Sequence, residues 1–488
     1  MRTDLVALTG ILAIATAAAS CGGDPTPEPT FTQADLMDPQ KCQKCHPDHY
    51  REWSGSMHAY AGDDPVFLAM NARAQRETDG AVGSFCVKCH APVALATGAT
   101  KDGTNLAELP SHLKGVTCYF CHSAAEVTDT HDAPITLAKD GQMRGSIADP
   151  TANEAHASKY SPLHDREKTE SASLCGSCHD VVSPLGAHIE RTFAEWKDTL
   201  FAHAPLGLTC GQCHMAGRQG VAADMPGVGV RRVHEHTFPG VDTALTTFPE
   251  ADAQKAAVQA SLDGTLQAAL CVKGSAGAAT IQVVLDNVGA GHGWPSGSTQ
   301  DRRAWVELLA YAGQTTVYQS GVVPDGTSVT ALTDPDLWLV RDCILDGNGK
   351  EVHMFWEAAS YDSNQLPGPV TSSQTDPDYY KTHVVRTFPR PTSTPAVIPM
   401  PDRVTMRVRL VPVGLDVLDD LIASGDLDAS VKAKMPTWTL GGTDLEWTEA
   451  AATIKYVDQG QPVLCVTRGL TTGANAGVPA PERTMCGP

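Results

Sequence analysis

The segment Cys42-Gln43-Lys44-Cys45-His46 carries the pattern that organises the first half of this chain. The same Cys-x-x-Cys-His pattern recurs at residues 86–90, 118–122, 175–179 and 210–214. Two thiols at this spacing, followed at once by an imidazole, form the attachment signature of a c-type haem. The thiols bond to two vinyl groups at one edge of the porphyrin, and the histidine reaches the iron. The sequence therefore predicts five covalently bound haem c groups.

A zinc knuckle and a redox dithiol also contain a Cys-x-x-Cys pair. A zinc protein would use the motifs in pairs, would leave one of the five over, and would not need a histidine after each second cysteine. We therefore assign a haem to every motif. The predicted attachment residues are Cys42, Cys45, Cys86, Cys89, Cys118, Cys121, Cys175, Cys178, Cys210 and Cys213. The predicted proximal iron ligands are His46, His90, His122, His179 and His214.

The chain is long and acidic. Its 488 residues exceed the size that one hydrophobic core usually organises, so at least two domains are expected. Its formal net charge is −20 at pH 7, which disfavours nucleic acid and anionic lipid headgroups as partners. The charge suits a basic redox partner, and a merely solvated surface explains it equally well.

Residues 1–20 have the composition of an export signal. The apolar run 5–19 is too short and too rich in alanine to remain as a membrane span. An Ala-Ser dipeptide precedes Cys21, as at the cleavage site of bacterial lipoproteins, where this cysteine becomes the acylated first residue. Ordinary cleavage after Ala19 is the alternative. We expect an exported lipoprotein of the bacterial outer membrane, on the periplasmic or cell-surface face, that touches the membrane only through its lipid.

Composition divides the chain into five segments. They are a signal peptide (1–20), a Pro-rich tether (21–37), a pentahaem cytochrome c domain (38–250), a connector (251–279) and a β-sandwich-like domain (280–488). The tether is too polar and too rich in proline to bury a core. The haem domain has few long hydrophobic repeats. We therefore expect it to consist of short helices and loops wrapped around haems that form most of its core.

Strand-like runs separated by turns fill the last segment. They are rich in Val, Ile, Leu and aromatic residues and cover 281–285, 304–311, 404–410 and 462–466. In 404–410 apolar and polar residues alternate, as a half-buried strand requires. The sequence Asp346-Gly347-Asn348-Gly349 is a hairpin turn signal. These features predict an all-β, sandwich-like domain.

Residues 42–59 resemble the opening haem module of the cytochrome c-552/4 type multihaem cytochromes. The residues that carry the resemblance after the first motif are Tyr50, Glu52, Trp53, Ser56, His58 and Ala59. Residues 174–215 resemble the same proteins over their whole length. The resemblance implies a pentahaem cytochrome with a C-terminal β domain, and it implies that His58 is a distal iron ligand.

The resemblance also points to distal ligands elsewhere. Positions where relatives carry such ligands hold His156 and His164. His236 lies in a segment that resembles the piece closing the haem region in these proteins and is also a leading candidate, and His112 is the next one. Weaker candidates are His188, His203 and His234, followed by His49 and His131. A second neutral imidazole makes the iron six-coordinate and low-spin, which suits electron transfer.

Two further segments resemble parts of these proteins. Residues 195–202 repeat 52–59, with Phe201 at the position of the distal histidine. Residues 289–297 are similar to a Gly-His-x-Phe-Pro-Thr-Gly segment at the head of the β domain in related multihaem cytochromes. Its His292 is interpreted either as an iron ligand or propionate partner, or as part of a glycine-rich structural turn.

Four cysteines remain after the haem motifs and Cys21 are set aside: Cys271, Cys343, Cys465 and Cys486. In an oxidising compartment four thiols suggest two disulfides, for which three connectivities exist. We expect Cys465 to pair with Cys486, because this bond closes a short terminal loop. Cys271 would then pair with Cys343.

Two functions fit these features. We expect an exported pentahaem cytochrome that transfers electrons between redox partner proteins, or to an extracellular acceptor, at a bacterial cell envelope. The alternative is a multihaem oxidoreductase in which one iron keeps an open position and acts on a small nitrogen or sulfur compound. The 18 histidines exceed the number that five doubly ligated irons would use. This surplus favours electron transfer, so we predict no catalytic residue.

Overall fold

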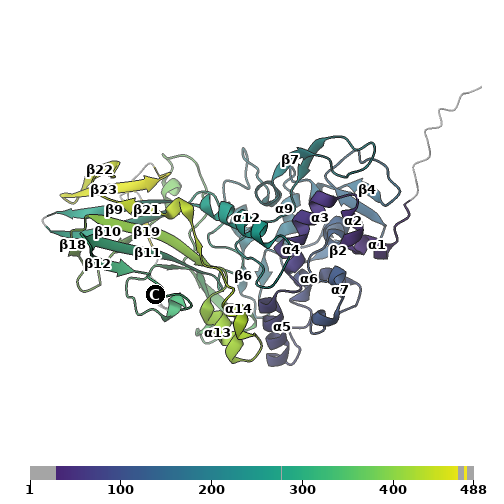
Figure 1. Cartoon of the computed structure of the whole chain (residues 1–488), viewed down its shortest axis with the longest axis horizontal. Coiled ribbons are helices and arrows are strands. Elements are labelled where there is room, and N and C mark those ends of the chain that lie inside the picture. Colours follow the sequence, from purple (N-terminus) through teal and green to yellow (C-terminus); the bar gives the residue numbers. More distant parts are fainter. Residues whose placement is uncertain (1–28, 276, 471–476, 481–488) are drawn as a thin grey trace, which may run out of the picture.

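The computed structural model describes residues 29–275, 277–470 and 477–480. Figure 1 shows an elongated molecule with short helices in its N-terminal half and strands in its C-terminal half. None of the described helices has the length and apolar character that a membrane span requires. The expected signal peptide, the expected acylation site Cys21 and the cysteine Cys486 lie outside the described residues.

The N-terminal half consists of short helices joined by loops. The helices are α1 (Gln33–Met37), α2 (Pro39–Gln43), α3 (Pro47–Ser54), α4 (Met57–Tyr60), α5 (Pro65–Glu77), α6 (Val87–His90), α7 (Pro92–Ala96), α8 (Cys118–Ser123), α9 (Ser171–Gly176), α10 (Thr192–Lys197) and α11 (Cys210–His214). Single 3-10 turns are η1 (Leu106–Glu108), η2 (Ser111–Leu113) and η3 (Pro162–His164). Proline opens α2, α3, α5 and α7, because the first helical residue has no intrahelical use for its N–H.

Two-stranded ladders connect these helices. They pair β1 (Ala124–Val127) with β2 (Ile135–Leu137), β3 (Gln142–Gly145) with β4 (Ala157–Tyr160), β5 (Val181–Val182) with β6 (His188–Glu190), and β7 (Gly217–Gly220) with β8 (Arg231–His234). The β3–β4 pair is parallel and the other three are antiparallel. Such short ladders make no extended core of their own.

Two of the motif helices begin at the first cysteine of their motif, directly after a capping threonine. Thr117 precedes α8, and its side chain accepts a hydrogen bond from the backbone N–H of Phe120. Thr209 precedes α11 and forms a capping box with Gln212. These side chains satisfy N–H groups that have no partner within the helix. The turns that present the motifs 118–122 and 210–214 are therefore specified by their own local sequence.

The C-terminal half contains two main sheets and one small sheet. Its strands are β9 (Leu266–Ser275), β10 (Ala278–Asn287), β11 (Arg303–Ala312), β12 (Thr315–Ser320), β13 (Leu339–Val340), β14 (Asp342–Leu345), β15 (Glu351–Val352), β16 (Ser360–Ser363), β17 (His383–Phe388), β18 (Ile398–Pro399), β19 (Arg403–Val411), β20 (Trp438–Thr439), β21 (Leu445–Trp447), β22 (Ile454–Asp458), β23 (Gln461–Arg468) and β24 (Val478–Pro479). Its helices and 3-10 turns are α12 (Ala251–Asp263), α13 (Leu415–Ala423), α14 (Ala429–Lys432), η4 (Val329–Ala331), η5 (Phe355–Glu357), η6 (Pro377–Thr382) and η7 (Gly441–Thr443).

The larger sheet has the order β22-β23-β9-β10-β17-β24, and β18 also pairs with β10. The second sheet has the order β12-β11-β19-β20, with β13 beside β11 and β21 beside β19. The small sheet has the order β15-β14-β16. The four predicted strand runs fall within β10, β11, β19 and β23, and the predicted hairpin turn joins β14 to β15. The strand-rich character of this half is confirmed.

The two main sheets share one hydrophobic core. Leu270 and Ile281 from the larger sheet lie in the same buried cluster as Val306 and Val408 from the second sheet. Along β19, buried and half-buried residues alternate as predicted. Burying each large apolar side chain contributes about 1.5–3 kcal/mol, so this core is the main source of stability in the C-terminal half.

The expected connector, residues 251–279, is part of the fold. Helix α12 forms its first part. The following strand β9 lies inside the larger sheet, where it pairs with both β10 and β23. Residues 266–272 form a run that is mostly apolar and mostly buried. Such a run has no alternation to mark it as a strand, because a central strand is covered on both faces.

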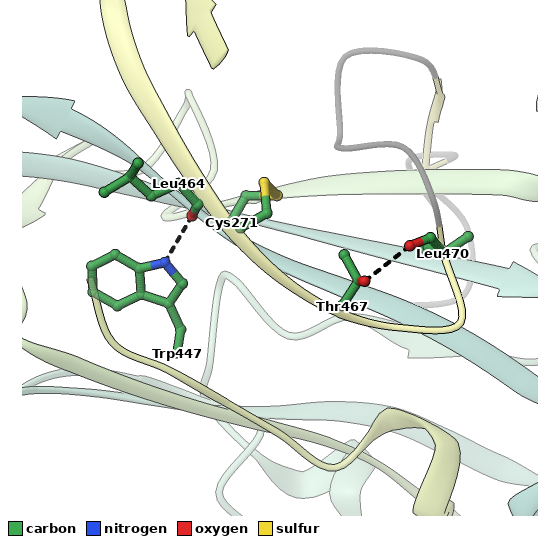
Figure 2. Close-up of a disulfide and its surroundings, with 6 residues drawn as sticks. Cys271, Trp447, Leu464, Thr467 and Leu470 are labelled. Atoms are coloured by element: carbon green, nitrogen blue, oxygen red, sulfur yellow. Dashed lines mark hydrogen bonds between the residues drawn. A yellow bond between two sulfur atoms is a disulfide. The ribbon is translucent and has the colours of Figure 1, made fainter. Parts of the chain in front are cut away.

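The predicted disulfides are wrong. Cys271 on β9 is bonded to Cys465 on β23, and the two residues lie directly opposite each other in the antiparallel ladder (Figure 2). The bond joins positions 194 residues apart, whereas spacing along the chain had favoured Cys465 with Cys486. Cys343 on β14 is also disulfide-bonded, but not to Cys271. The order of strands in the sheet, which chain spacing does not reveal, decides the pairing.

Buried contacts and ion pairs join the two halves. Val66 of α5 lies in one apolar cluster with residues of α13. On the same two helices, Arg73 donates to Asp420 across 3.1 Å. Elsewhere along the boundary, Arg191 lies 2.7 Å from the buried carboxylate of Asp342 on β14. The C-terminal half is therefore fixed against the haem motifs, and its loops can contribute to the sites there.

Candidate haem sites

The five motifs lie in one region of the structure. In the sequence, the first cysteine of the first motif and the first cysteine of the last motif are 168 positions apart, at 42 and 210. We number them motif I (42–46), motif II (86–90), motif III (118–122), motif IV (175–179) and motif V (210–214). The sulfur atoms of Cys42 and Cys118, of Cys89 and Cys178, and of Cys175 and Cys210 lie close enough to interact with one another. Motif I therefore lies beside motif III, and motif IV lies beside both motif II and motif V. The ten motif cysteines form no disulfide with one another.

Backbone carbonyls orient most of the proximal histidines. In His46, Nδ1 lies 2.6 Å from the backbone oxygen of Ala222. In His90, Nδ1 lies 3.1 Å from the backbone oxygen of Ala61. In His214, Nδ1 lies 2.8 Å from the backbone oxygen of Pro239. The Nδ1 atom of His122 bonds the carbonyl of Arg144. An Nδ1–H that donates to a carbonyl leaves the lone pair on Nε2, and it also fixes the plane of the ring. These side chains are therefore prepared to bind a metal through Nε2.

Three proximal histidines face a second imidazole. The ring centres of His46 and His156 are 6.2 Å apart, and those of His179 and His58 are also 6.2 Å apart. The ring of His122 lies 6.4 Å from the ring of His236. Two imidazoles that bind one metal ion from opposite sides, through bonds of about 2 Å, have their ring centres roughly 6 Å apart. The three pairs fit two axial ligands of a haem iron.

The other two leading candidates are placed differently. The Nε2 atom of His164 is engaged by the carbonyl of Cys121 at 2.7 Å, and its Nδ1 is buried without a hydrogen-bond partner. Its ring also lies 5.7 Å from His122, which already faces His236. His112 lies in the turn η2, and the ring contacts of the described proximal histidines do not include it.

The weaker candidates divide into buried and peripheral residues. His49 packs edge-on against His236, with ring centres 4.8 Å apart, and it lies beside the haem pair of motif III. The ring centres of His131 and His188 are 6.4 Å apart. His203 is exposed. Burial lowers the pKa of His234 to about 4.

Partial burial favours the neutral form of the distal imidazoles His58, His156 and His236. It lowers the pKa of His58 to about 3, and the nearby imidazoles of His179 and His214 lower it further. Burial likewise lowers the pKa of His156 and His236 below the ordinary value. A metal binds the neutral form of histidine, so these side chains need lose no proton at neutral pH.

The segment that presents His58 is repeated in space as well as in sequence. In the first copy, Trp53 Nε1 donates to the carbonyl of Val116 at 2.8 Å, and the N–H of Val116 donates to the carbonyl of His58 at 2.8 Å. In the second copy, the indole of Trp196 donates to the carbonyl of Leu208 at 2.9 Å, and Leu208 N donates to the carbonyl of Phe201 at 2.7 Å. Phe201 therefore occupies the structural position of the first copy's histidine.

Two side chains add to this picture. His292, whose role the sequence left open, is half-buried and lies in the neighbourhood of His214 and His179. The ring of His90 in motif II is stacked on Phe67, with centres 4.0 Å apart and planes 3° apart. The sequence offered no signal for Phe67, because an apolar residue in α5 is expected to pack in a core.

Residues 41–123 match the family model described as cytochrome c554 and c-prime. A comparison with curated proteins found no match. The fold is similar to that of a penta-heme cytochrome c552 from Thermochromatium tepidum, with a TM-score of 0.54, 17% sequence identity, and coverage of 83% of this chain and 98% of that chain. At this identity the likeness shows a shared fold. Together with the repeated Cys-x-x-Cys-His motifs, the family match and the shared fold support the assignment of this chain as a multihaem c-type cytochrome with covalently bound haem.

Proposed function

We propose that this chain is an exported pentahaem c-type cytochrome that transfers electrons between redox partners at a bacterial cell envelope. The observation that carries the proposal is the pairing of imidazoles at 6.2–6.4 Å around three of the proximal histidines. A haem iron supplies reversible one-electron chemistry, and two axial imidazoles leave it no position for a substrate. The paired sites thus suit electron transfer better than catalysis.

The chain's own residues support this role in three ways. Backbone carbonyls hold the proximal rings, so little rearrangement accompanies a change of charge at the site. The packing of motifs against one another places neighbouring sites close together. The net charge of −20 attracts a basic redox partner and repels nucleic acid.

The haem content is tested by the mass of the purified mature protein. We expect a mass increment that corresponds to five haem groups, because every motif has both cysteines and the histidine. The cysteines should then be unreactive toward alkylating reagents in the denatured protein. An increment of four haems or fewer would show that at least one motif is not used.

The proposed location depends on residues 1–21 alone. The junction before Cys21 supports a lipoprotein that is anchored to the bacterial outer membrane, with the Pro-rich tether between the lipid and α1. Acylation would leave the haem half free to meet a periplasmic or extracellular partner. Covalent haem attachment also requires export, which agrees with a signal peptide.

One observation favours a second function, an oxidoreductase with one open haem that acts on a small nitrogen or sulfur compound. The ring beside His90 is that of Phe67, whereas three other proximal histidines face an imidazole. An iron held by His90 alone would accept a ligand from solution. Titration of the reduced parent protein with CO distinguishes the two functions. Absence of CO binding supports electron transfer alone, and one equivalent bound supports the oxidoreductase.

A further inference from the structure

We propose that Arg166 is a positioning residue of motif V, and that its buried positive charge raises the reduction potential of the haem attached there. The inference rests on the proposed haem content of motif V. It goes beyond that proposal because it names a side chain that distinguishes one haem from the others. The spacing of the motifs gives no sign of Arg166, which lies 43 residues before Thr209 in the chain.

The backbone of Arg166 holds the beginning of the motif V helix α11. The hydroxyl of Thr209, the N-cap residue of this helix, donates to the carbonyl of Arg166 at 2.7 Å. This hydrogen bond is buried. The first turn of motif V is therefore anchored to the segment that joins η3 to α9.

The guanidinium of Arg166 holds the other end of the same helix. Its Nη1 donates to the carbonyl of Gly211 at 3.2 Å and also to the carbonyl of Met215. Carbonyl groups at the end of a helix have no partner within it, and a cation is favoured there. Met215 directly follows the proximal histidine His214. Arg166 therefore fixes the backbone on both sides of the Cys213-His214 pair.

Glycine at position 211 makes this close approach possible. Gly211 is buried, and a Cβ atom on it would lie 3.0 Å from the Cβ of Arg166, which is tighter than ordinary van der Waals contact. At the same place after the first cysteine, motifs I, II and III carry Gln43, Val87 and Tyr119. The packing of Arg166 accounts for the small residue in motif V.

The positive charge of Arg166 is buried and only partly balanced. Its side chain is 7% exposed, and within the described part of the chain its Nε makes no hydrogen bond. The carboxylate of Glu167 lies 3.3 Å from this atom, but the Glu167 side chain is 47% exposed. Glu167 also accepts from Gln212 Nε2 at 2.9 Å and lies 3.6 Å from the guanidinium of Arg232. One carboxylate in contact with water is thus shared between two guanidinium groups.

Motif III offers a contrast to this arrangement. Arg144 supplies the carbonyl that orients the proximal histidine His122, and its side chain is 8% exposed. Its guanidinium faces both carboxylate oxygens of Asp140, at 2.7 and 3.2 Å. Such a two-point ion pair balances the charge of the arginine. The two sites therefore differ in local charge, although each contains a buried arginine.

A buried cation beside a haem favours the ferrous state, because reduction removes one positive charge from the iron. Water screens the exposed carboxylate of Glu167 more than it screens the buried guanidinium of Arg166. A net positive field therefore remains at motif V. We expect the haem of this motif to accept an electron more readily than it would without Arg166.

The test uses the full-length holoprotein with Arg166→Gln. In a potentiometric titration at low ionic strength, we expect about one fifth of the haem absorbance change to move to lower potential. Arg166→Lys keeps the charge and should restore the potential of the parent. A role in packing alone predicts the same change for both variants, because lysine cannot reproduce the planar fork of arginine. Equal shifts in the two variants would therefore overturn the inference.

Two neighbouring residues supply controls. Arg232→Gln removes a guanidinium that is 55% exposed and lies beside the same Glu167, so its shift should be smaller than that of Arg166→Gln. A shift as large as that of Arg166→Gln would count against a special role for the buried charge. Glu167→Gln removes the shared carboxylate at an exposed position and should move the same fraction of the haem to higher potential. This variant carries the test even if Arg166→Gln does not fold, since a potential that stays or falls contradicts the inference.

Peptide mapping distinguishes failure of the inference from failure of the proposed function. If the peptide that contains Cys210 and Cys213 carries no haem in the parent, then the proposed haem content is wrong. If that peptide carries haem, and Arg166→Gln with all its haems attached titrates as the parent does, then Arg166 does not set the potential of motif V.

Discussion

His58 links a short sequence motif to a spectroscopic property, since its ring lies 6.2 Å from that of His179. The His58→Ala variant should convert one haem from low-spin to high-spin, because an open sixth position replaces a strong-field ligand. The reduced variant should bind one equivalent of CO more than the parent. Electron paramagnetic resonance and CO titration measure the two effects.

The exposed histidine His203 offers a matched control. His203→Ala removes an imidazole from the neighbourhood of the second repeat without removing a ring that faces a proximal histidine. Its spectrum should equal that of the parent. An unaltered spectrum in His58→Ala, with all haems attached, would contradict the assignment of His58.

Single residues show how far sequence reasoning reaches in this protein. The spacing of the motifs predicts the roles of their cysteines and histidines directly. The ligand roles of His156 and His236 stay predictions from a resemblance, and the structure adds that the ring of each lies near a proximal histidine far from it in the chain. His164 also matched the resemblance, yet its Nε2 is engaged by the carbonyl of Cys121. No spacing rule reveals such a hydrogen bond.

Asp301 should make the stability of the β half depend on pH. Burial raises the pKa of this carboxyl from 3.8 to about 7, against the charges of Arg303 and Arg302, and Glu190 and Asp242 raise it further. Between pH 4 and pH 7 the folded state therefore keeps a proton that the unfolded state has released, so stability falls as pH rises. In this range Asp301 lowers the free energy of unfolding by about 1.4 kcal/mol for each pH unit.

The Asp301→Asn variant should lose this part of the pH dependence. Thermal unfolding at pH 5 and pH 7 measures this dependence. From pH 5 to pH 7 the free energy of unfolding of the parent should fall by about 2–3 kcal/mol more than that of the variant. Asp444→Asn, at an exposed position of the same half, is the matched control and should follow the parent. Equal slopes for parent and Asp301→Asn would contradict the raised pKa.

At the level of elements, the disulfide between β9 and β23 ties two central strands of the larger sheet. The double variant Cys271→Ala/Cys465→Ala should lower the free energy of unfolding of the β half by about 2–5 kcal/mol, because the unfolded chain gains the freedom that a long closed loop had removed. Urea unfolding followed by far-ultraviolet circular dichroism measures the loss. A variant as stable as the parent would show that the bond contributes nothing.

The strands of the C-terminal half show which elements can be predicted from the sequence. The run in β19 alternates, and the hairpin between β14 and β15 has its own turn residues, so both could be predicted. Strand β9 has neither signal, because it is covered on both faces and adjoins a helix. Its place between β10 and β23, and with it the disulfide, depends on long-range pairing that local sequence does not encode.

For the whole molecule, the proposed anchor at Cys21 predicts where the protein is found in the cell. Replacing Cys21 with Ser should release the protein from the membrane fraction into the soluble fraction, with its haem content unchanged, because acylation needs the thiol and haem attachment does not. Fractionation without detergent and haem staining measure this. A parent protein that is already soluble without detergent would favour ordinary signal cleavage.

The burial of the motif cysteines has a consequence for the biogenesis of this cytochrome. Cys86 is only 8% exposed, and thiols of different motifs touch, as Cys89 and Cys178 do. We expect haem to be joined to these thiols while the chain is still extended, because a folded chain restricts the approach of an attaching enzyme. In an oxidising compartment the touching thiols would otherwise close into wrong disulfides.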